Sequence, residues 1–149
     1  MSPQQLAEAV RDAMLVNDRA TRMMGMQILA VGPGTATVAM DVREDMLNGF
    51  EICHGGLITT LADSAFAFAC NSHNVLTVAS GFSVDIMAPA RQGDRLTASA
   101  VEVSRAGRTG VYDIGVRNQR DELIAVFRGR SYSIKGKAVL PPHATDASH

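Results

Sequence analysis

One glycine pair and one isolated carboxylate are the residues of this sequence that are best placed to do chemistry. Gly55-Gly56 opens a run of apolar and small residues that predicts a helix over 55–71. Asp63 is the only formally charged residue between Glu51 and Asp85, and it falls midway along that helix. Burying a carboxylate among leucine, alanine and phenylalanine side chains is costly unless the group is paired or used. The helix start and Asp63 are therefore the first candidates for a site.

The start of the predicted helix is suited to stabilising negative charge on a carbonyl oxygen. Unpaired N–H groups and the positive end of the helix dipole favour a developing oxyanion. Because Gly55 and Gly56 lack a Cβ, a substrate can approach their backbone closely. One such donor contributes about 3–4 kcal/mol to catalysis. The structural alternative is that the two glycines only let the loop turn tightly into the helix.

Asp63 also has a structural interpretation, in which it simply faces water. It belongs to a stripe of polar and small residues at helical spacing: Thr59, Thr60, Asp63, Ser64, Ala67 and Asn71. A solvated helix face normally carries Lys, Glu or Arg, and this stripe carries none. Small uncharged neighbours instead indicate a contact surface or a crevice.

The spacing of the two candidates predicts how they would cooperate. Gly55 and Asp63 are eight residues apart, which is about 12 Å along a helix. They can therefore act on one bond only if they come from different chains. Two antiparallel helices related by a two-fold axis would place Gly55 of one chain opposite Asp63 of the other. We expect a homodimer to build the site.

The rest of the chain supplies elements that can enclose such a helix. Ser2, Pro3 and Gln5 form a capping pattern that predicts an N-terminal helix over 3–16. Two short strands are predicted at 26–31 and 35–42 around a Gly-Pro-Gly turn. Four β-branched runs follow the glycine-initiated helix and predict strands in meander order at 76–87, 95–103, 110–117 and 123–134.

A helix that is apolar on most sides needs a sheet that curls around it, because no other segment can cover it. The sequence therefore predicts the α+β class and the hotdog fold, an antiparallel β-sheet wrapped around one long central helix. We expect one domain over 1–134, long enough for a sizeable core. The segment 135–149 is rich in Gly, Pro, His and Ser, which predicts a disordered tail.

Composition excludes several classes of partner. The 149 residues are 46% apolar with a formal net charge of −1, and the Lys and Arg residues are scattered. This pattern indicates neither nucleic-acid binding nor a membrane anchor, and the N-terminus lacks a signal-peptide layout. We expect a cytoplasmic protein. Cys53 and Cys70 form no disulfide framework and no metal motif, and adjacent Cys53 and His54 are a poor nucleophile–base pair because consecutive side chains usually point apart.

The motif around the helix resembles the active-site signature of a known family. It reads Asn48-x5-His54-Gly55-Gly56 followed by Leu61-Ala62-Asp63-Ser64-Ala65. This is similar to hotdog-fold acyl-CoA thioesterases, and specifically to the phenylacetate-degradation (PaaI-type) branch. Further matching stretches are Ser83-Val84-Asp85-Ile86, Pro89-Ala90, Gly93-Asp94 and Gly107-Arg108-Thr109-Gly110-Val111-Tyr112. The resemblance implies hydrolysis of a small-molecule acyl-CoA in a homodimer, often within a homotetramer, with no metal and no cofactor beyond the coenzyme A of the substrate.

The resemblance also assigns roles to individual residues. Asp63 matches the nucleophile or general base, and the sequence leaves both roles open. Gly55 matches the residue whose N–H polarises the thioester carbonyl, while His54 and Asn48 match residues that orient the carbonyl and the water. The candidates for contacting substrate or coenzyme A are Gly56, Ser80, Ser83, Arg91, Arg108 and Thr109.

Three functions remain open at this stage. The first is hydrolysis of acyl-CoA, with an arylacetyl group such as phenylacetyl or hydroxyphenylacetyl suggested by the resemblance alone. The second is a hotdog acyl-thioester hydratase or dehydratase, which usually places a His and an acid together at the Cα–Cβ bond. The third is a non-enzymatic acyl-CoA binding module. The spacing around Asp63 favours the hydrolase because no His lies near Asp63 in the sequence.

Overall fold

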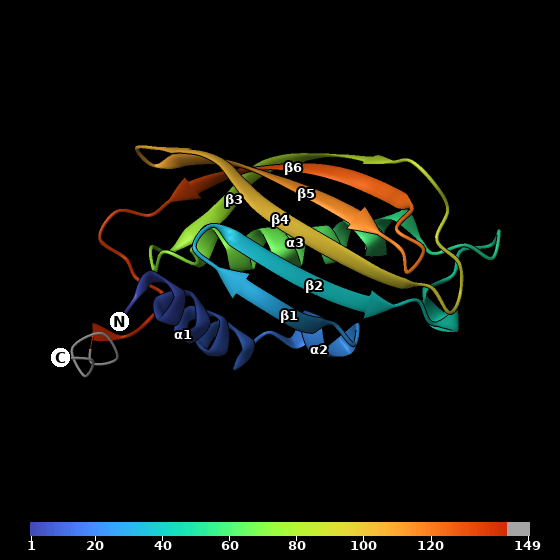
Figure 1. Ribbon diagram of the computed structural model, residues 1–149, viewed down its shortest axis with the longest axis horizontal. Helices are drawn as coiled ribbons and strands as arrows, with labels where there is room; N and C mark the ends of the chain where they lie inside the picture. The colour runs from blue at the N-terminus through green and yellow to red at the C-terminus, as the bar shows by residue number, and fades with distance from the viewer. Residues whose placement is uncertain (143–149) are drawn as a thin grey trace.

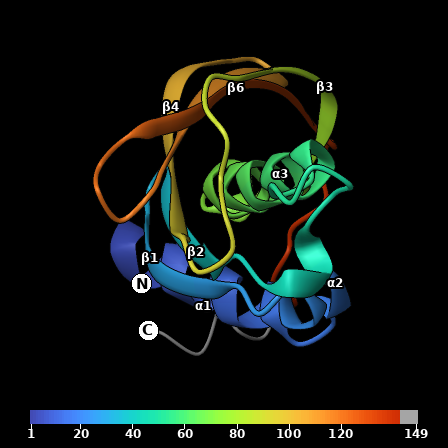
Figure 2. The same cartoon turned by 90° about the vertical axis from the view of Figure 1, so that its right-hand side faces the viewer.

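The helix α3, Gly55–Asn71, runs through the middle of a curled antiparallel sheet (Figures 1 and 2). The structure is a computed structural model, and it describes residues 1–142. Most of α3 is buried, including Ile58, Leu61, Ala62, Ala65, Phe66, Phe68 and Ala69. Its bounds and its central place confirm the predicted hotdog architecture.

Six strands form the sheet in the order β1-β2-β4-β5-β6-β3, and every neighbouring pair is antiparallel. The first hairpin joins β1, Gln27–Gly32, to β2, Thr35–Asp41, through a turn in which Gly34 has φ 71°. The remaining strands are β3, Thr77–Ile86; β4, Arg95–Ala106; β5, Thr109–Arg117; and β6, Leu123–Ser133. Each lies within three residues of its predicted range.

The predicted meander is wrong for β3. Strands β4, β5 and β6 do follow one another, but β3 pairs with β6 at the far edge of the sheet, with Ile86 opposite Ala125. The free edge of β4 is already taken by β2, where Thr35 faces Val101. With that position occupied, β3 joins the sheet at the outer edge of β6 instead. The loop 87–94 crosses the end of the helix to connect β3 with β4 (Figure 2).

The two faces of the sheet differ in polarity, as expected for a sheet that covers a helix: the concave face is apolar and the convex face carries charged residues. On β5 and β6 the concave face carries buried residues such as Tyr112, Ile114, Ala125 and Phe127, while Asp113, Arg128 and Arg130 lie on the convex face. Gly129 leaves room for the ring of Phe66, since a Cβ at Gly129 would lie 2.6 Å from that ring. The helix and the sheet thus meet in close contact.

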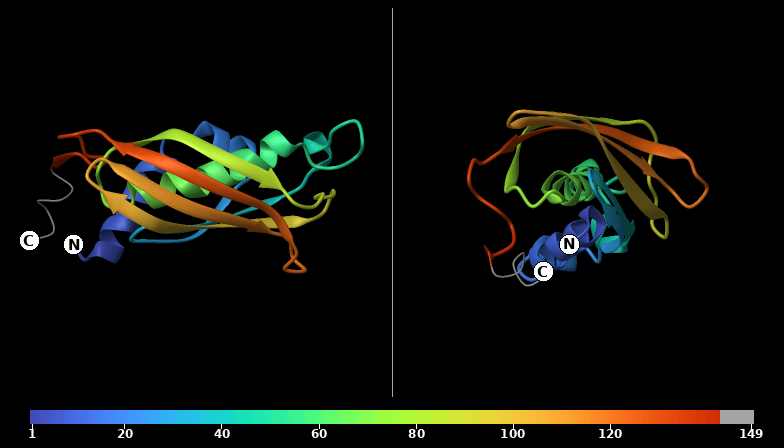
Figure 3. Two further views of the ribbon diagram at one scale, coloured as in Figure 1. Left: turned by 90° about the horizontal axis from the view of Figure 1, so that it is seen from above. Right: turned by 60° about the vertical axis from the view of Figure 1, so that its left-hand side comes forward.

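The N-terminal helices lie beside strand β1 of the N-terminal hairpin (Figure 1), and Figure 3 shows the same region, in blue, from two further sides. Helix α1, Pro3–Leu15, has the predicted capping box, in which Ser2 and Gln5 exchange hydrogen bonds, and ends one residue before the predicted boundary. It lies against β1 through buried Ala7 and Val10. Helix α2, Arg19–Met23, and a short 3-10 turn at Glu44–Met46 complete the elements. No helix within residues 1–142 is long and apolar enough to cross a membrane.

The segment after β6 differs from the predicted disorder over its described part. The side chain of Leu140 is buried, and its N–H donates to Asn74 Oδ1 at 2.8 Å. The N–H of Leu76 donates to the Lys137 carbonyl at 3.0 Å. A buried leucine and these backbone bonds order a segment whose composition resembles a flexible tail. The rest of the predicted tail, 143–149, lies outside the described residues.

Candidate active site

The N-terminus of α3 leaves one backbone donor open. His54 is the N-cap residue: its Nδ1 accepts a hydrogen bond of 3.4 Å from the Gly56 N–H, and its carbonyl accepts from the N–H groups of Leu57 and Ile58. Within residues 1–142, the N–H of Gly55 has no hydrogen-bond acceptor. This donor combines with the positive end of a 17-residue helix, so it can stabilise an oxyanion.

A tight loop holds Asn48 beside the helix start. The Asn48 Oδ1 atom accepts hydrogen bonds from the N–H groups of Phe50 and Ile52, at 2.9 and 3.4 Å. An isolated bridge pairs Leu47 with Cys53, and the His54 N–H donates to the Met46 carbonyl at 2.8 Å. The predicted residues Asn48, His54 and Gly55 are therefore brought to one end of α3. Because its oxygen is used within the loop, Asn48 has its amide NH2 group left to offer a substrate.

The loop between β3 and β4 reaches the same end of α3. The Cys53 N–H donates to the Ala90 carbonyl at 2.7 Å, which places the exposed Arg91 near the helix start. Asp94 shapes this loop, since it accepts hydrogen bonds from the Arg91 N–H and the Gln119 side chain at 2.8 and 2.9 Å. Burial opposes ionisation of Asp94, but these bonds and nearby arginines outweigh it and lower its pKa. The ionised Asp94 side chain therefore stabilises the loop that carries Arg91.

Asp63 lies halfway along α3. It is half-buried, and no hydrogen bond or ion pair reaches its carboxylate from residues 1–142. Burial raises its pKa above the ordinary 3.8. A carboxylate that has lost water without gaining a partner is a stronger base than a solvated one. This is the environment that a base or a nucleophile requires, and it contrasts with the solvated alternative.

The other predicted contact residues do not gather around Asp63 within one chain. Ser83 lies on the convex face, where the Arg130 guanidinium donates to its Oγ at 3.4 Å. Ser80 is the extra residue of a bulge, and its hydroxyl donates to the Arg130 carbonyl. Arg108 and Thr109 lie at the β4–β5 turn. That turn and the Arg91 loop are at opposite ends of β4, whose 12 residues span roughly 40 Å.

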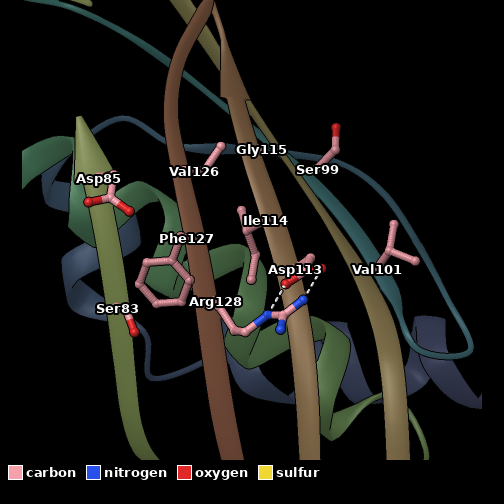
Figure 4. Close-up of a pocket in the computed structure, with 10 residues that line it drawn as sticks. All are labelled: Ser83, Asp85, Ser99, Val101, Asp113, Ile114, Gly115, Val126, Phe127 and Arg128. Carbon is pink, nitrogen blue, oxygen red and sulfur yellow. Dashed lines mark hydrogen bonds and ion pairs between the residues drawn. The ribbon is translucent and has the colours of Figure 1, made fainter. Parts of the chain in front are cut away.

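A hollow lies on the convex face of the sheet (Figure 4). Its walls include Ser83, Ser99, Val101 and Val126, and the Arg128 guanidinium and the Asp113 carboxylate form two hydrogen bonds of 2.7 and 2.8 Å beside it. The sheet separates this hollow from α3. Of the predicted site residues it contains only Ser83, so it is distinct from the open Gly55 N–H and Asp63.

Sequence reasoning missed the concave face of β3 as part of the site. An ideal Cβ built on Gly55 lies 3.9 Å from Ile86 Cγ1, so Ile86 packs directly beside the helix start. The rings of Phe82 and Phe127 stack with centroids 4.8 Å apart and an interplanar angle of 23°. Phe82, Val84 and Ile86 alternate along β3. This period-two pattern is the signal that places them on one face.

The cysteines take no part in this arrangement. Burial raises the pKa of the Cys53 thiol to about 11 and is the main cause that raises the pKa of Cys70 to about 12, so both remain protonated at neutral pH. Protonated thiols are poor nucleophiles. Within residues 1–142, no three His, Cys, Asp or Glu side chains come together in a way that could hold a metal ion.

A curled sheet around a central helix, with an open N-terminal donor and a half-buried carboxylate, defines a hotdog-fold protein with a candidate active site on that helix. Residues 50–125 match the model of the thioesterase superfamily. The chain is 44% identical to the acyl-coenzyme A thioesterase PaaI of Escherichia coli, over 83% of this chain and 89% of that protein. It is 39% identical to a putative esterase of Archaeoglobus fulgidus, over 87% and 84% of the two chains.

Solved structures give the same result. The E. coli PaaI protein, from the phenylacetic acid degradation operon, superposes with a TM-score of 0.89 at 42% identity, over 91% of this chain and 99% of that one. A mutant of the Thermus thermophilus phenylacetic acid degradation protein PaaI gives 0.76 at 37% identity, over 78% and 100%. The chain belongs to the thioesterase superfamily. It is a thioester hydrolase of the PaaI type, which confirms the resemblance seen in the sequence.

Proposed function

We propose that this enzyme hydrolyses acyl-CoA thioesters with an arylacetyl group, such as phenylacetyl-CoA or hydroxyphenylacetyl-CoA, to the free acid and coenzyme A. The observation that carries the proposal is the Gly55 N–H at the start of α3, which has no acceptor among residues 1–142. The names of two PaaI relatives, which refer to acyl-coenzyme A and to phenylacetic acid degradation, support the substrate class. The enzyme works as a homodimer, and we expect it to assemble further into a homotetramer.

The thioester carbonyl oxygen would accept a hydrogen bond from the Gly55 N–H. Charge grows on this oxygen as the carbonyl carbon becomes tetrahedral, and a fixed donor at a helix start stabilises that charge by about 3–4 kcal/mol. His54 and the amide NH2 of Asn48 lie at the same helix end and would orient the carbonyl and the attacking water. These groups act before and during attack because the loop around Asn48 is already formed.

Asp63 of the partner protomer would supply the second half of the reaction. As a general base, it takes a proton from water while the water oxygen bonds to the carbonyl carbon. The carbon–sulfur bond then breaks, and the coenzyme A sulfur leaves as a thiolate that takes up a proton. As a nucleophile, Asp63 would instead form a mixed anhydride that water cleaves. Single turnover in oxygen-18 water distinguishes the routes, since only cleavage of the anhydride at the Asp63 carbonyl labels the side chain.

A hydratase or dehydratase of the same fold is the alternative enzyme. It would need a histidine and an acid near one Cα–Cβ bond. His73 Nε2 is instead paired with Glu102 at 2.9 Å beyond the C-terminal end of α3, and His54 caps the other end. Within residues 1–142, Asp63 thus has no histidine partner, and this observation favours hydrolysis.

A panel of acyl-CoA substrates tests the proposal. Release of free thiol from acetyl-, hexanoyl-, phenylacetyl- and hydroxyphenylacetyl-CoA is measured, and the highest kcat/KM is expected for the two aryl substrates. The Asp63→Asn variant should retain binding and lose turnover. Binding without thiol release across the panel would favour the acyl-CoA binding module, and a change in acyl unsaturation without thiol release would favour the hydratase.

A further inference from the structure

Ile86 occupies the space beside the proposed carbonyl site. Its Cγ1 atom lies 3.9 Å from the position of a Cβ on Gly55, and 46% of its surface is exposed. A carbonyl oxygen bound to the Gly55 N–H brings its carbonyl carbon within a few ångströms of this side chain. Ile86 therefore contacts one of the two groups attached to that carbon, the acyl group or the sulfur of coenzyme A.

The concave face of β3 continues from Ile86 toward the level of Asp63. Strand β3 runs antiparallel to α3: Ile86 lies at Gly55, and at the other end Thr77 and Asn71 share two hydrogen bonds of 3.0 and 3.1 Å. Phe82 is five residues from Thr77, roughly 16 Å, and Asp63 is eight residues from Asn71, about 12 Å. Both positions are near the midpoint of their element, so Phe82 stands level with Asp63.

This face of β3 is apolar and only partly covered. Phe82, Val84 and Ile86 share it, because their partners on β6 are Gly129, Phe127 and Ala125, all of which are buried. Phe82 stacks on Phe127 yet keeps 44% of its surface exposed. Phe82, Val84 and Ile86 thus form an apolar wall on edge strand β3. The ring of Phe127 packs behind Phe82 and supports this wall.

We infer that this wall is the acyl-recognition surface, with Ile86 limiting the space next to the carbonyl and Phe82 contacting an aryl ring. The inference rests on the proposed function. Phe82 and Ile86 are four positions apart on β3, roughly 13 Å, so an acyl group with one ring and a one-carbon spacer fits between them. Offset or tilted contact with an exposed ring favours an aromatic group over an aliphatic chain of similar size.

The alternative assignment would place the pantetheine arm of coenzyme A along this wall. That arm carries two amides, which lose hydrogen bonds against apolar side chains that offer none. The acyl group has no such groups beyond the carbonyl, and burying its carbon surface is favourable. The chemistry of the wall therefore selects the acyl side of the thioester.

Three substitutions on one strand test the inference. Ile86→Phe fills the space beside Gly55, and kcat/KM for phenylacetyl-CoA should fall about tenfold relative to acetyl-CoA. Phe82→Leu keeps an apolar side chain but removes the ring, so kcat/KM for phenylacetyl-CoA should fall about two- to tenfold relative to hexanoyl-CoA. Val78→Phe is the matched control: Val78 is also 46% exposed on β3, but it lies on the convex face opposite Tyr132. It should leave both ratios unchanged.

The three substrates separate failure of the inference from failure of the proposed function. Selective loss in the two concave-face variants, with acetyl-CoA turnover retained as the control for folding, supports the acyl wall. Unchanged ratios, or an equal loss for every substrate, overturn it while leaving the hydrolase intact. A wild-type enzyme that releases no thiol from any of the three substrates would instead refute the proposed function itself.

Discussion

Gly55 and Asp63 lie on one uninterrupted helix, eight residues apart, and within residues 1–142 neither the Gly55 N–H at its start nor the Asp63 carboxylate near its middle has a hydrogen-bond partner. The separation along the axis is about 12 Å, whereas an attacking atom must approach within about 3–3.5 Å of the carbonyl carbon. No rotamer of an aspartate spans that difference. The proposed reaction therefore needs Gly55 from one chain and Asp63 from another, as the proposed homodimer would provide.

Mixing inactive chains should restore activity. A dimer that combines an Asp63→Ala chain with a Gly55→Pro chain contains one site with both a normal Gly55 and a normal Asp63. We expect each variant alone to be nearly inactive. The mixture should recover up to about a quarter of wild-type activity, because half of the dimers at random exchange are mixed and each has one complete site. Thiol release after verified subunit exchange measures this.

The matching control mixes wild-type chains with chains that carry both Asp63→Ala and Gly55→Pro. Those mixed dimers contain one Gly55 and one Asp63 on the same protomer, which places them in different sites. No recovery is expected beyond the wild-type dimers present. Recovery in this control, or its absence from the first mixture, would show that the site is built within one chain.

The backbone donor can be removed without breaking the helix. Gly55 is the first residue of α3, a position where proline is favoured, and His54 has φ −59° and ψ 129°, which suits a residue before proline. Gly55→Pro should lower kcat about 10²–10³-fold while the circular dichroism spectrum stays unchanged. Gly55→Ala keeps the N–H, and its Cβ meets nothing closer than 3.9 Å, so it should lose far less. Equal losses in both variants would exclude the donor role.

The sequence predicts the local elements of this fold better than their pairing. The bounds of α3 follow from a glycine start, an apolar run and a polar end. The edge position of β3 does not follow from any local pattern, because it depends on β2 already occupying β4. Neighbouring strands in sequence pair only about two-thirds of the time.

The candidate site was predictable where its residues are close in sequence. Asn48, His54 and Gly55 share one loop and helix start, and Asp63 follows from its lone charge. Phe82 and Phe127 come together only because β3 pairs with β6, and no local signal links them. The bulge at Ser80 likewise sets which face Ser83 occupies. Sites formed by distant strands require the register of the sheet.

Activity should depend on pH through Asp63. Burial raises the pKa of this carboxyl above 3.8, and the ionised form is needed either to accept a proton or to attack. We therefore expect kcat/KM to fall on the acidic side with an apparent pKa above 3.8. In Asp63→Asn the remaining activity should be at least about 100-fold lower and should lose this acidic limb. A pH–rate profile with stable acyl-CoA substrates checks both points.

The buried charge of Asp63 should lower the stability of the folded protein at neutral pH. A carboxyl whose pKa is raised on folding binds protons more tightly in the folded state, so its contribution favours folding below the unfolded pKa and is lost as pH rises through the folded pKa. Asp63→Asn removes the buried charge and should raise the melting temperature at pH 7 by about 1–2 °C. The increase should disappear near pH 3.5, and a decrease at pH 7 would indicate a stabilising partner for Asp63.

Gly129 is expected to tolerate no larger residue. A Cβ at this position would lie 2.6 Å from the ring of Phe66, and that ring is itself fixed between Tyr112 and Phe127 at centroid distances of 5.6 and 5.9 Å. Gly129→Ala should lower the free energy of unfolding by about 1–3 kcal/mol. Gly115→Ala on β5 is the control, since no atom lies within 4 Å of its added Cβ. Urea unfolding of the two variants should therefore differ clearly.

Partly buried hydrogen bonds to Glu102, near the C-terminal end of α3, should give a second pH effect, with the opposite sign. The Tyr112 hydroxyl and His73 Nε2 contact Glu102 Oε1 at 2.8 and 2.9 Å. Burial alone would raise the pKa of Glu102, but these contacts outweigh it and lower the pKa below 4.5. Such a carboxylate stabilises the fold above its unfolded pKa, and the contribution is lost as pH falls through the folded pKa.

Removing the Tyr112 hydroxyl tests the hydrogen bond between Tyr112 and Glu102. Tyr112→Phe keeps the ring against Phe66 and should cost about 1–2 kcal/mol at pH 7, because one hydrogen bond to a charged acceptor is lost. The difference between wild type and variant should shrink as pH falls through the lowered pKa of Glu102, because its carboxylate then becomes protonated in both. Thermal unfolding from pH 3 to pH 7 measures this difference in stability. Tyr132→Phe, on the convex face, is the exposed control. A difference that stays constant across this range would show that the charge of Glu102 is not involved.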